Sequence, residues 1–432
     1  MLAVLNLNAS SDLAGQAFGP ARPFRFASAD LRDGDRMKIV IGADQYPEYI
    51  NGAATFTARL AAGLADAGHT VDLLWPSADG GHDTYLERGV RVHRLSSVSL
   101  PGRPRMQVVA PHTARRQVER VLQIAQPDVV HVQSHLGLGR TLLRRAQRSA
   151  IPVLATNHFM PENLLHHVPV VRQFPHTASQ VAWRDLERVF AGADLLSVPT
   201  RRAAELLAAS TTLAAAEVVS CGIDLDRFAV APLRRATGTP ILLFVGRLEQ
   251  EKHVDELLRA LARLPRTLAV RLEIVGMGSL RPSLEALVDA LGLGPCVSFL
   301  GAVDDDALLA AYARADVFVM PGTAELQSIA TLEAMATGLP VLAADAMALP
   351  HLVRHDVNGR LYAPGDDGSL AADLALLLGD QALRARLGRG SRTLAQAHSL
   401  SSTIETFERH YATLVASRVG AGLVDRDLAM AA

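Results

Sequence analysis

Short apolar runs recur along the chain from Met37 onward, and they do not alternate with polar residues. Such runs are typical of strands that are buried on both faces of a parallel sheet, and the longer helical patterns between them provide the crossovers. The predicted strands span residues 37–43, 70–75, 128–133, 152–158, 194–199, 217–222, 241–246, 271–276, 296–301, 316–321 and 340–345, with helices between them such as 53–67 and 253–263. The pattern predicts an α/β fold with two doubly wound parallel sheets.

The same pattern predicts four parts of the chain. Residues 1–36 lack periodicity and are interpreted as a loosely ordered extension. A polar stretch with Pro and Gly, residues 230–240, joins the two α/β domains, which are predicted at 37–230 and 231–396. Residues 397–432 are predicted to form a C-terminal helix that packs back toward the first domain, followed by a tail. Functional residues are expected directly after strands, because ligands bind beyond the carboxyl ends of strands in such sheets.

Composition narrows the functional classes. Of 432 residues 49% are hydrophobic, yet no apolar run approaches the roughly 20 residues that span a bilayer, and the first residues lack the basic region of a secretory signal. The only two cysteines, Cys221 and Cys296, are far apart, which suits a reducing cytoplasm and argues against a disulfide framework. The net charge of −1 gives no general attraction to nucleic acid. These features predict a cytoplasmic protein that does not bind nucleic acid.

The stretch that follows strand 241–246 contains two cations. Only two of the 43 Lys and Arg residues are lysines, and one of them, Lys252, stands five residues after Arg247 and just before a predicted helix. Cations near a helix N-terminus are unfavourable because the helix dipole is positive there, and a bound anion would remove the conflict. The stretch therefore predicts a phosphate site. In the alternative interpretation the cations pair with acidic neighbours, namely Glu249, Glu251 or Asp255.

Gly276 and Gly278 follow strand 271–276 and are similar to the start of a dinucleotide-binding fingerprint. The third glycine of that fingerprint is missing at the required spacing, so an NAD site is disfavoured. We expect a loop whose glycines allow a nucleotide to approach the backbone.

Two glutamates, Glu325 and Glu333, lie in a region from 323 to 353 that contains no Lys or Arg. A helix is predicted to start near Ser328, a favourable N-cap, and to end before Gly338. Glu333 then lies on the same stripe as three apolar residues, Ile329, Leu332 and Ala336. A carboxylate that points inward is costly unless something donates hydrogen bonds to it, and ribose hydroxyls would serve. Glu325, in the loop before the helix, could reach a second polyol; in the alternative interpretation both glutamates lie on a solvated face.

Five stretches together give a family resemblance. From Met37 to about Tyr411 the chain resembles the retaining GT-B glycosyltransferases of family 4. The matching stretches, in the family's order, are YPEYINGAATFTARLAAGLADAGHTV, CGIDLDRF, VGRLEQEKHVDELLRAL, FLGAVDDDALLAAYARADVFVMP and ELQSIATLEAMATGLPVLAAD. The resemblance implies two Rossmann-like domains, with an NDP-sugar donor held mainly by the C-terminal domain and an acceptor held mainly by the N-terminal domain.

The resemblance also implies roles for individual residues. Arg247 and Lys252 match the family's diphosphate-binding pair, Glu333 matches the glutamate that binds the donor ribose, and Glu325 matches the one that contacts the donor sugar. The other residues expected at the substrate-binding site are Gly52, in the first loop of the N-terminal domain, and Gly246, Gly276, Val303 and Ile329.

His158 matches a histidine that points at the donor sugar near the reacting carbon, although a histidine at a strand end can also simply be buried. The predicted catalytic residues are therefore His158, Arg247, Lys252 and Glu325.

The chain departs from the family after Glu325, where Leu326-Gln327-Ser328 replaces Gly-Phe-Gly. Because Leu326 cannot adopt glycine's backbone angles freely, the departure puts the identity of the donor in doubt.

No metal or cofactor is predicted. Asp224 and Asp226 form a DxD, but the family does not use a metal bound by this motif. His131 and His135 have the spacing of zinc ligands without the glutamate of an HExxH motif.

Residues 101–150 hold nine arginines against only two acidic residues. Arg140, Arg144, Arg145 and Arg148 are predicted on one face of a helix. The face is interpreted either as solvated or as a contact with anionic lipid or a phosphorylated acceptor, which would place the protein at the inner membrane face.

The sequence thus predicts a metal-independent, retaining glycosyltransferase. It would move a hexose from a UDP or GDP donor to an acceptor hydroxyl of a small molecule, glycan or lipid, forming an α-glycosidic bond. We expect front-face attack in which the leaving phosphate accepts the acceptor's proton. The alternatives are a catalytically inactive nucleotide-sugar-binding partner and an NDP-sugar epimerase of similar fold.

Overall fold

The computed structural model describes residues 36–44, 52–100, 103–161, 175–229, 238–265 and 267–431. The predicted N-terminal extension, except Arg36, and most of the predicted interdomain stretch lie outside these residues. Internal contacts divide the chain into two units. Unit 1 comprises the described parts of Met1–Thr156, Gly192–Leu195 and Glu408–Ala432, and unit 2 those of Asn157–Ala191 and Leu196–Phe407. The domain boundaries given above stay predictions.

The first sheet has eight strands in the order β10-β9-β8-β7-β1-β2-β4-β3. The neighbours β10/β9, β8/β7, β7/β1, β1/β2 and β2/β4 are parallel, and β4/β3 is antiparallel. Its strands are β1 (Lys38–Gly42), β2 (Thr70–Pro76), β3 (Asp83–Glu87), β4 (Val90–Leu95), β7 (Val129–Val132), β8 (Val153–Thr156), β9 (Leu195–Val198) and β10 (Glu217–Val218). A separate antiparallel ribbon is formed by β5 (Ser97–Leu100) and β6 (Arg103–Val109). The helices of this part of the chain are α1 (Gly52–Asp66), α2 (Pro111–Ala125), α3 (Gly137–Arg148), α5 (Pro175–Phe190), α6 (Arg201–Ser210) and α7 (Leu225–Ala229).

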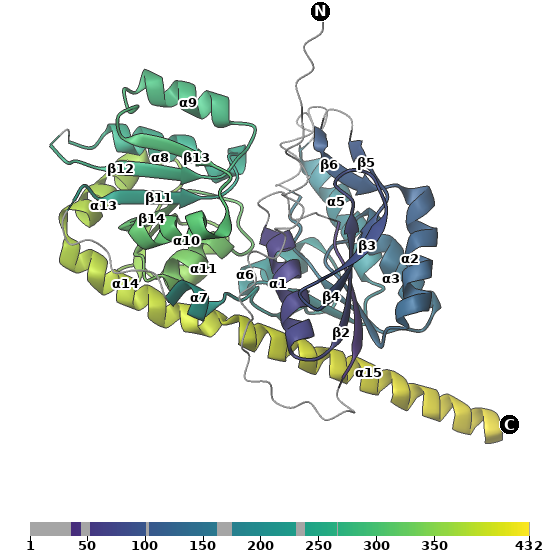
Figure 1. The fold of residues 1–432 in the computed structure, drawn as a ribbon. Coiled ribbons are helices and arrows are strands. Elements are labelled where there is room, and N and C mark those ends of the chain that lie inside the picture. Colours follow the sequence, from purple (N-terminus) through teal and green to yellow (C-terminus); the bar gives the residue numbers. More distant parts are fainter. Residues whose placement is uncertain are drawn as a thin grey trace, which may run out of the picture. The chain divides into compact units, whose positions relative to one another are not determined.

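The second sheet has six parallel strands in the order β13-β12-β11-β14-β15-β16. Its strands are β11 (Ile241–Val245), β12 (Arg271–Val275), β13 (Val297–Gly301), β14 (Val317–Met320), β15 (Val341–Ala344) and β16 (Gly359–Tyr362). Its helices are α8 (Val254–Ala262), α9 (Arg281–Ala290), α10 (Asp305–Arg314), α11 (Ile329–Ala336), α12 (Leu349–Leu352), α13 (Asp367–Gly379) and α14 (Gln381–Ala395). Helices α8, α9 and α13 pack together, as do α11 and α14, so the sheet lies between two helical layers (Figure 1).

Each sheet has one point at which the strand order reverses. In the first sheet the chain runs outward from β1 to one edge and from β7 to the other, and in the second it does so from β11 and β14. At such a switch point the loops after the two central strands diverge and leave room for a ligand. The two doubly wound sheets confirm the predicted fold class.

All eleven predicted strands are present, although β10 is reduced to two residues. Five strands were not predicted: β3 to β6 and β16. Strand β3 alternates half-buried and exposed residues and pairs antiparallel with β4 at the edge of the sheet, so it lacks the apolar run of a central strand.

Helix α15 (Leu400–Ala431) ends the chain, and its described side chains from Glu408 onward belong to unit 1. Within that unit, the Tyr411 hydroxyl forms a hydrogen bond of 2.7 Å with His131 Nδ1, and Glu408 Oε1 lies 2.9 Å from His69 Nε2. No helix in the described part of the chain combines the length and apolarity needed to cross a bilayer.

Candidate active site

The switch point of the second sheet carries three of the predicted site residues. Arg247 and Lys252 lie in the loop after β11, and Glu325 lies in the loop after β14. The Lys252 ammonium group pairs with the Glu325 carboxylate, so it joins the two loops that flank the switch point. The partner of Glu325 is thus a cation 73 residues away, which the local sequence around the glutamate could not reveal. Glu325 is 8% exposed, so the predicted alternative of a solvated face is wrong for this residue.

Arg247 pairs with a different carboxylate. Its Nη2 lies 2.6 Å from Glu251 Oε1, and the Glu251 side chain is buried. The alternative of pairing with an acidic neighbour therefore holds for Arg247 but not for Lys252. Because a guanidinium group has five N–H donors, one bond to Glu251 leaves it able to bind phosphate as well, and the phosphate assignment stays a prediction.

The glycines after β11 and β12 bring two loops into contact. A Cβ added to Gly276 would lie 1.9 Å from the Gly246 carbonyl oxygen, and one added to Gly278 would lie 2.2 Å from the Leu248 carbonyl oxygen. Gly276 also has φ +134°, a backbone conformation that L side chains rarely adopt. The observed reason for glycine here is close packing of the loop against its neighbour; whether a nucleotide also approaches stays a prediction.

Helix α11 begins and ends as predicted. The Ser328 side chain accepts a hydrogen bond from Thr331 N, and Gly338 follows the helix with φ +75°. The predicted inward stripe is too narrow, however, because every residue of α11 except Ala330 is buried. The helix packs between β14, β15, α7 and α14, which leaves it no solvated face.

Glu333 is 5% exposed and accepts a hydrogen bond of 3.0 Å from the Tyr312 hydroxyl on α10. The solvated-face alternative is therefore wrong for Glu333 too. The sequence analysis missed this partner of Glu333, because Tyr312 lies 21 residues earlier on a different helix.

The other predicted residues are distributed over both units. Val303 lies half-buried in the loop after β13, and Ile329 is the first, buried residue of α11. His158 follows β8, and burial lowers the pKa of its imidazole to about 4. Gly52 is the first residue of α1 in unit 1, and its role at the substrate-binding site stays a prediction.

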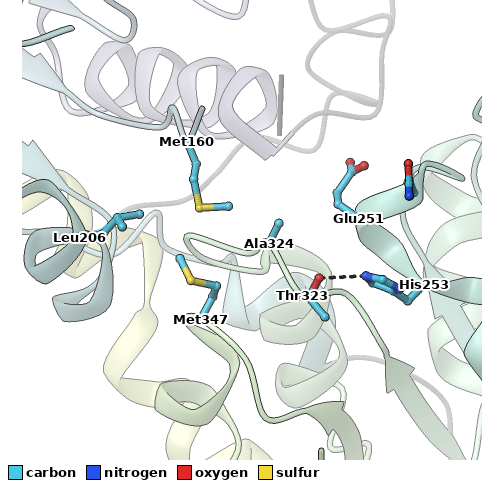
Figure 2. Close-up of a pocket in the computed structure, with 8 residues that line it drawn as sticks. Met160, Leu206, Glu251, His253, Thr323, Ala324 and Met347 are labelled. Atoms are coloured by element: carbon cyan, nitrogen blue, oxygen red, sulfur yellow. Dashed lines mark hydrogen bonds between the residues drawn. The ribbon is translucent and has the colours of Figure 1, made fainter. Parts of the chain in front are cut away.

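A pocket of about 380 Å³ in unit 2 is lined partly by residues of the loops after β11 and β14. Figure 2 shows Met160, Leu206 and Met347 on one side of it and Glu251, Thr323 and His253 on the other, with a hydrogen bond of 3.0 Å between His253 Nε2 and Thr323 Oγ1. Gln250 and Ala324 complete the lining. No periodicity marks these residues in the sequence, because five separate segments contribute them.

The described residues contain no group of three or more His, Cys, Asp or Glu side chains that could hold a metal ion. Both ring nitrogens of His131 form hydrogen bonds, to Tyr411 and to Thr156. The Asp224 carboxylate accepts a hydrogen bond from Arg227 N.

Two family models match the chain: Glycosyltransferase Family 4 over residues 50–227 and Glycosyl transferases group 1 over residues 227–394. A GDP-mannose-dependent alpha-mannosyltransferase from Mycolicibacterium smegmatis is 30% identical, over 88% of this chain and 99% of its own length. Another with the same name, from Mycobacterium tuberculosis, is 32% identical over 76% and 85%. The chain belongs to the group 1 glycosyltransferases.

Solved structures agree on the fold of this glycosyltransferase. Sucrose-phosphate synthase from Thermosynechococcus elongatus matches 88% of the chain with a TM-score of 0.73 at 21% identity and is itself covered completely. HepE from Anabaena, in complex with UDP, matches 87% with a TM-score of 0.68 at 19% identity and is also covered completely. The fold is GT-B, as predicted, and the protein is a nucleotide-sugar-dependent transferase.

The departure from the family motif is accommodated by hydrogen bonds within unit 2. The Gln327 side chain accepts a hydrogen bond of 2.7 Å from Cys221 N, and the Thr200 hydroxyl donates one of 2.8 Å to the Leu326 carbonyl oxygen. Leu326 itself is buried. The loop that carries Glu325 in this glycosyltransferase is therefore fixed by two other segments of the chain.

Proposed function

We propose that this glycosyltransferase transfers a hexose from a GDP- or UDP-sugar to an acceptor hydroxyl, with retention of configuration and formation of an α-glycosidic bond. GDP-mannose is the donor we favour, because two relatives that cover most of the chain are named GDP-mannose-dependent alpha-mannosyltransferases.

The Lys252–Glu325 pair at the switch point is the observation that carries this proposal. A donor diphosphate needs cations that stabilise the charge that develops as the bond to the sugar breaks, and Arg247 and Lys252 provide two in the same loop. A sugar needs a fixed hydrogen-bond acceptor that orients it, and Glu325 lies beside Lys252. The pair thus combines both requirements at the position where ligands bind in such sheets.

The proposed reaction occurs on one face of the sugar. The acceptor oxygen forms a bond to the anomeric carbon while the bond from that carbon to the diphosphate oxygen breaks. The acceptor's proton moves to the departing phosphate oxygen. Arg247 and Lys252 stabilise the diphosphate, Glu333 binds the ribose, and Tyr312 holds the Glu333 carboxylate in place through its hydroxyl.

Calorimetry with GDP-mannose, UDP-glucose, GDP and UDP tests the donor, and NMR of the sugar released to water tests the stereochemistry. We expect the tightest binding for GDP-mannose and release of the α-anomer before mutarotation. Preference for UDP-glucose would overturn the choice of donor, and release of the β-anomer would overturn retention. Binding of none of the four would contradict the proposed function itself.

We also propose that unit 1 contacts an anionic membrane through a basic surface formed by α2 and α3. Of the four predicted arginines on α3, Arg144 and Arg148 are exposed. Arg145 pairs instead with Glu119 on α2 at 2.7 Å, and Arg140 donates to the His135 carbonyl oxygen. The neighbouring helix α2 adds exposed arginines to the surface: Arg115, Arg116 and Arg120.

Co-sedimentation with vesicles of phosphatidylglycerol and phosphatidylcholine tests the basic surface. Binding to the anionic vesicles should exceed binding to neutral ones, should weaken as salt screens the charges, and should fall for Arg144→Glu/Arg148→Glu. Arg188→Glu/Arg202→Glu, which reverses two exposed arginines of unit 2, is the matched control. Equal binding to both kinds of vesicle would leave the arginines as a solvated face.

A further inference from the structure

Glu251 has a carboxylate oxygen that the interactions described so far do not use. Its side chain is 4% exposed, and Arg247 binds only Oε1. Among the described residues no donor lies within hydrogen-bonding distance of Oε2, which is buried. A buried acceptor without a donor is costly, and such groups in native proteins call for a specific explanation.

We infer that Glu251 recognises the transferred sugar. Its Oε2 accepts a hydrogen bond from one hydroxyl of the donor's hexose and thereby helps to determine which sugar is used. This inference rests on the proposed function and adds a specificity-determining residue to it.

Glu251 is held both at its carboxylate and at its backbone. Arg247 holds Oε1, and the Glu251 carbonyl oxygen accepts a hydrogen bond of 3.0 Å from Thr323 N in the loop after β14. The residue also lies in the 3₁₀ turn Gln250–Lys252, which restricts its backbone. A carboxylate held in this way can discriminate between hydroxyl positions, because it does not have to be ordered when the sugar binds.

The pocket beside Glu251 has two chemically different walls, which suit a sugar ring. Glu251, Gln250 and the His253–Thr323 pair form the polar wall, and the apolar wall consists of Met160, Leu206, Ala324 and Met347 (Figure 2). A hexose presents hydroxyls at its edge and C–H groups on its face. Methionine side chains adapt their shape to such a face, and the volume of about 380 Å³ falls in the range of small-molecule sites.

The pocket also lies where a sugar attached to the diphosphate would be. A Cβ added to Gly322 would lie 3.3 Å from Glu325 Oε1, 3.5 Å from Lys252 Cδ and 3.5 Å from the Glu251 carbonyl oxygen. The predicted phosphate residue, the predicted sugar residue and Glu251 therefore converge around one glycine.

Two of the six non-glycine residues that have positive φ in the described part of the chain line the same pocket. His253 and Met347 have φ values of +46° and +49°, although neither is a glycine. Left-handed conformations at non-glycine residues cost free energy and cluster at ligand sites, where the surrounding structure maintains them. Here the two left-handed conformations occur at residues that line the pocket.

A cycle that combines enzyme variants with modified donors tests the inference. The donors are the deoxyfluoro analogues of the sugar nucleotide that wild type binds, GDP-mannose or UDP-glucose, because fluorine cannot donate a hydrogen bond. We expect one analogue to lower wild-type kcat/KM roughly tenfold, the scale of one charge-assisted hydrogen bond. Glu251→Gln should lower kcat/KM for the natural donor by a similar factor and lose nothing further with that analogue.

Glu249→Gln is the matched control, because it removes the same charge from the same loop while Glu249 binds Ser279 instead of Arg247. It should retain wild-type discrimination among the analogues. Binding of GDP or UDP to Glu251→Gln should stay within about twofold of wild type, which also establishes that the variant folds. Should it not fold, Glu251→Asp, which retains the charge but shortens the reach, takes its place in the cycle.

Three outcomes would overturn the inference. In the first, the loss of kcat/KM caused by Glu251→Gln and the loss caused by the analogue would be additive for every hydroxyl position. Glu251→Gln could weaken nucleotide and nucleotide sugar equally, which would make Glu251 a positioning residue for Arg247 alone. Finally, wild type could bind neither donor, which would contradict the proposed function together with the inference that rests on it.

Discussion

The two switch points of this molecule carry different charged groups. In unit 1 Asp44 follows β1, and its carboxylate accepts hydrogen bonds of 2.6 and 3.0 Å from Leu138 N and Gly139 N, at the start of the helix after β7. In unit 2 the loops after β11 and β14 instead bring two cations, Arg247 and Lys252, to the switch point, each paired with a carboxylate.

This difference favours the proposal that the switch point of unit 2 binds the donor's diphosphate. The first N–H groups of a helix attract anions, but in α3 the protein's own Asp44 already occupies two of them. The chain at α3 is also too tightly packed for an inserted ligand, since a Cβ at Gly139 would lie 1.9 Å from the Ser134 carbonyl oxygen. In unit 2 each of the two cations pairs with a different carboxylate, and a diphosphate can share both cations.

The largest expected effect follows from removing these cations. Lys252→Ala and Arg247→Ala should each lower kcat/KM by roughly 10²–10³, the scale observed when a preorganised charge-stabilising donor is lost. Steady-state kinetics with a donor sugar measures the effect, and circular dichroism checks the fold. A loss of less than about threefold in both variants would disprove the diphosphate assignment.

The two glutamates of unit 2 should differ from each other. Glu333→Gln should mainly raise KM for the donor and weaken free GDP as well, because ribose contacts are equally strong in the ground and transition states. Glu325→Gln should leave the affinity for GDP nearly unchanged and lower kcat, because the sugar loses its orientation. A charged hydrogen bond contributes about 1.5–3 kcal/mol, so each effect should be about 10- to 100-fold.

Calorimetry of GDP and UDP binding to both variants, beside kinetics, separates these roles. The side-chain amide introduced by Glu333→Gln can still accept the hydrogen bond from Tyr312, so this substitution tests the ligand contact more than the internal one. Equal loss of nucleotide affinity in both variants would show that the division between ribose and sugar is wrong.

The sequence predicted five of the six strands of the second sheet and both ends of α11 because these depend on local patterns. The apolar runs of β11, β12 and β14, the N-cap at Ser328 and the glycine after α11 all act within a few residues. Partners across the fold could not be predicted in this way. The contacts of Glu333 with Tyr312 and of Glu325 with Lys252 depend on how neighbouring loops and helices meet over the sheet.

The pocket beside Glu251 could not be predicted either, because it too depends on contacts between distant segments. The pocket beside Glu251 is assembled from residues that follow different strands, such as Met160 after β8 and Met347 after β15. Neither methionine differs in the sequence from an ordinary core residue. Strand β3 of unit 1 was not predicted for a simpler reason, because its exposed positions at the edge of the sheet break the apolar run.

His158 bears on the contrast between the two switch points, because its neutral imidazole adds no positive charge to unit 2. Burial lowers the pKa of its imidazole from 6.5 to about 4. Above pH 6.5 the imidazole is neutral in both the native and the unfolded state. As the pH falls toward 4, the imidazole gains a proton in the unfolded chain only. The free energy of unfolding therefore falls by up to about 1.4 kcal/mol per pH unit over this range. The melting temperature of wild type should therefore fall more steeply over this range than that of His158→Asn.

The difference in melting temperature between wild type and His158→Asn at pH 8 is the reference, because at that pH the protonation of His158 does not contribute to the difference. Parallel melting curves from pH 8 to pH 4 would show that His158 is accessible to protons in the native state. It could then contribute charge to the donor site, and the assignment of that charge to Arg247 and Lys252 alone would fail.

The smallest expected effect concerns Asp44, on the other side of the comparison. Burial raises the pKa of its carboxyl group, and the two amide hydrogen bonds partly compensate for that burial. Asp44→Asn keeps the shape and one acceptor but places an NH₂ group opposite one of the two amides. We expect a loss of about 1–2 kcal/mol of stability, within the range for one unsatisfied buried group, and an unchanged affinity for GDP. Thermal unfolding measures the stability, and calorimetry measures the affinity for GDP.

A drop in GDP affinity as large as that of Lys252→Ala would mean that the diphosphate site depends on unit 1 as much as on unit 2. The contrast between the switch points would then no longer hold.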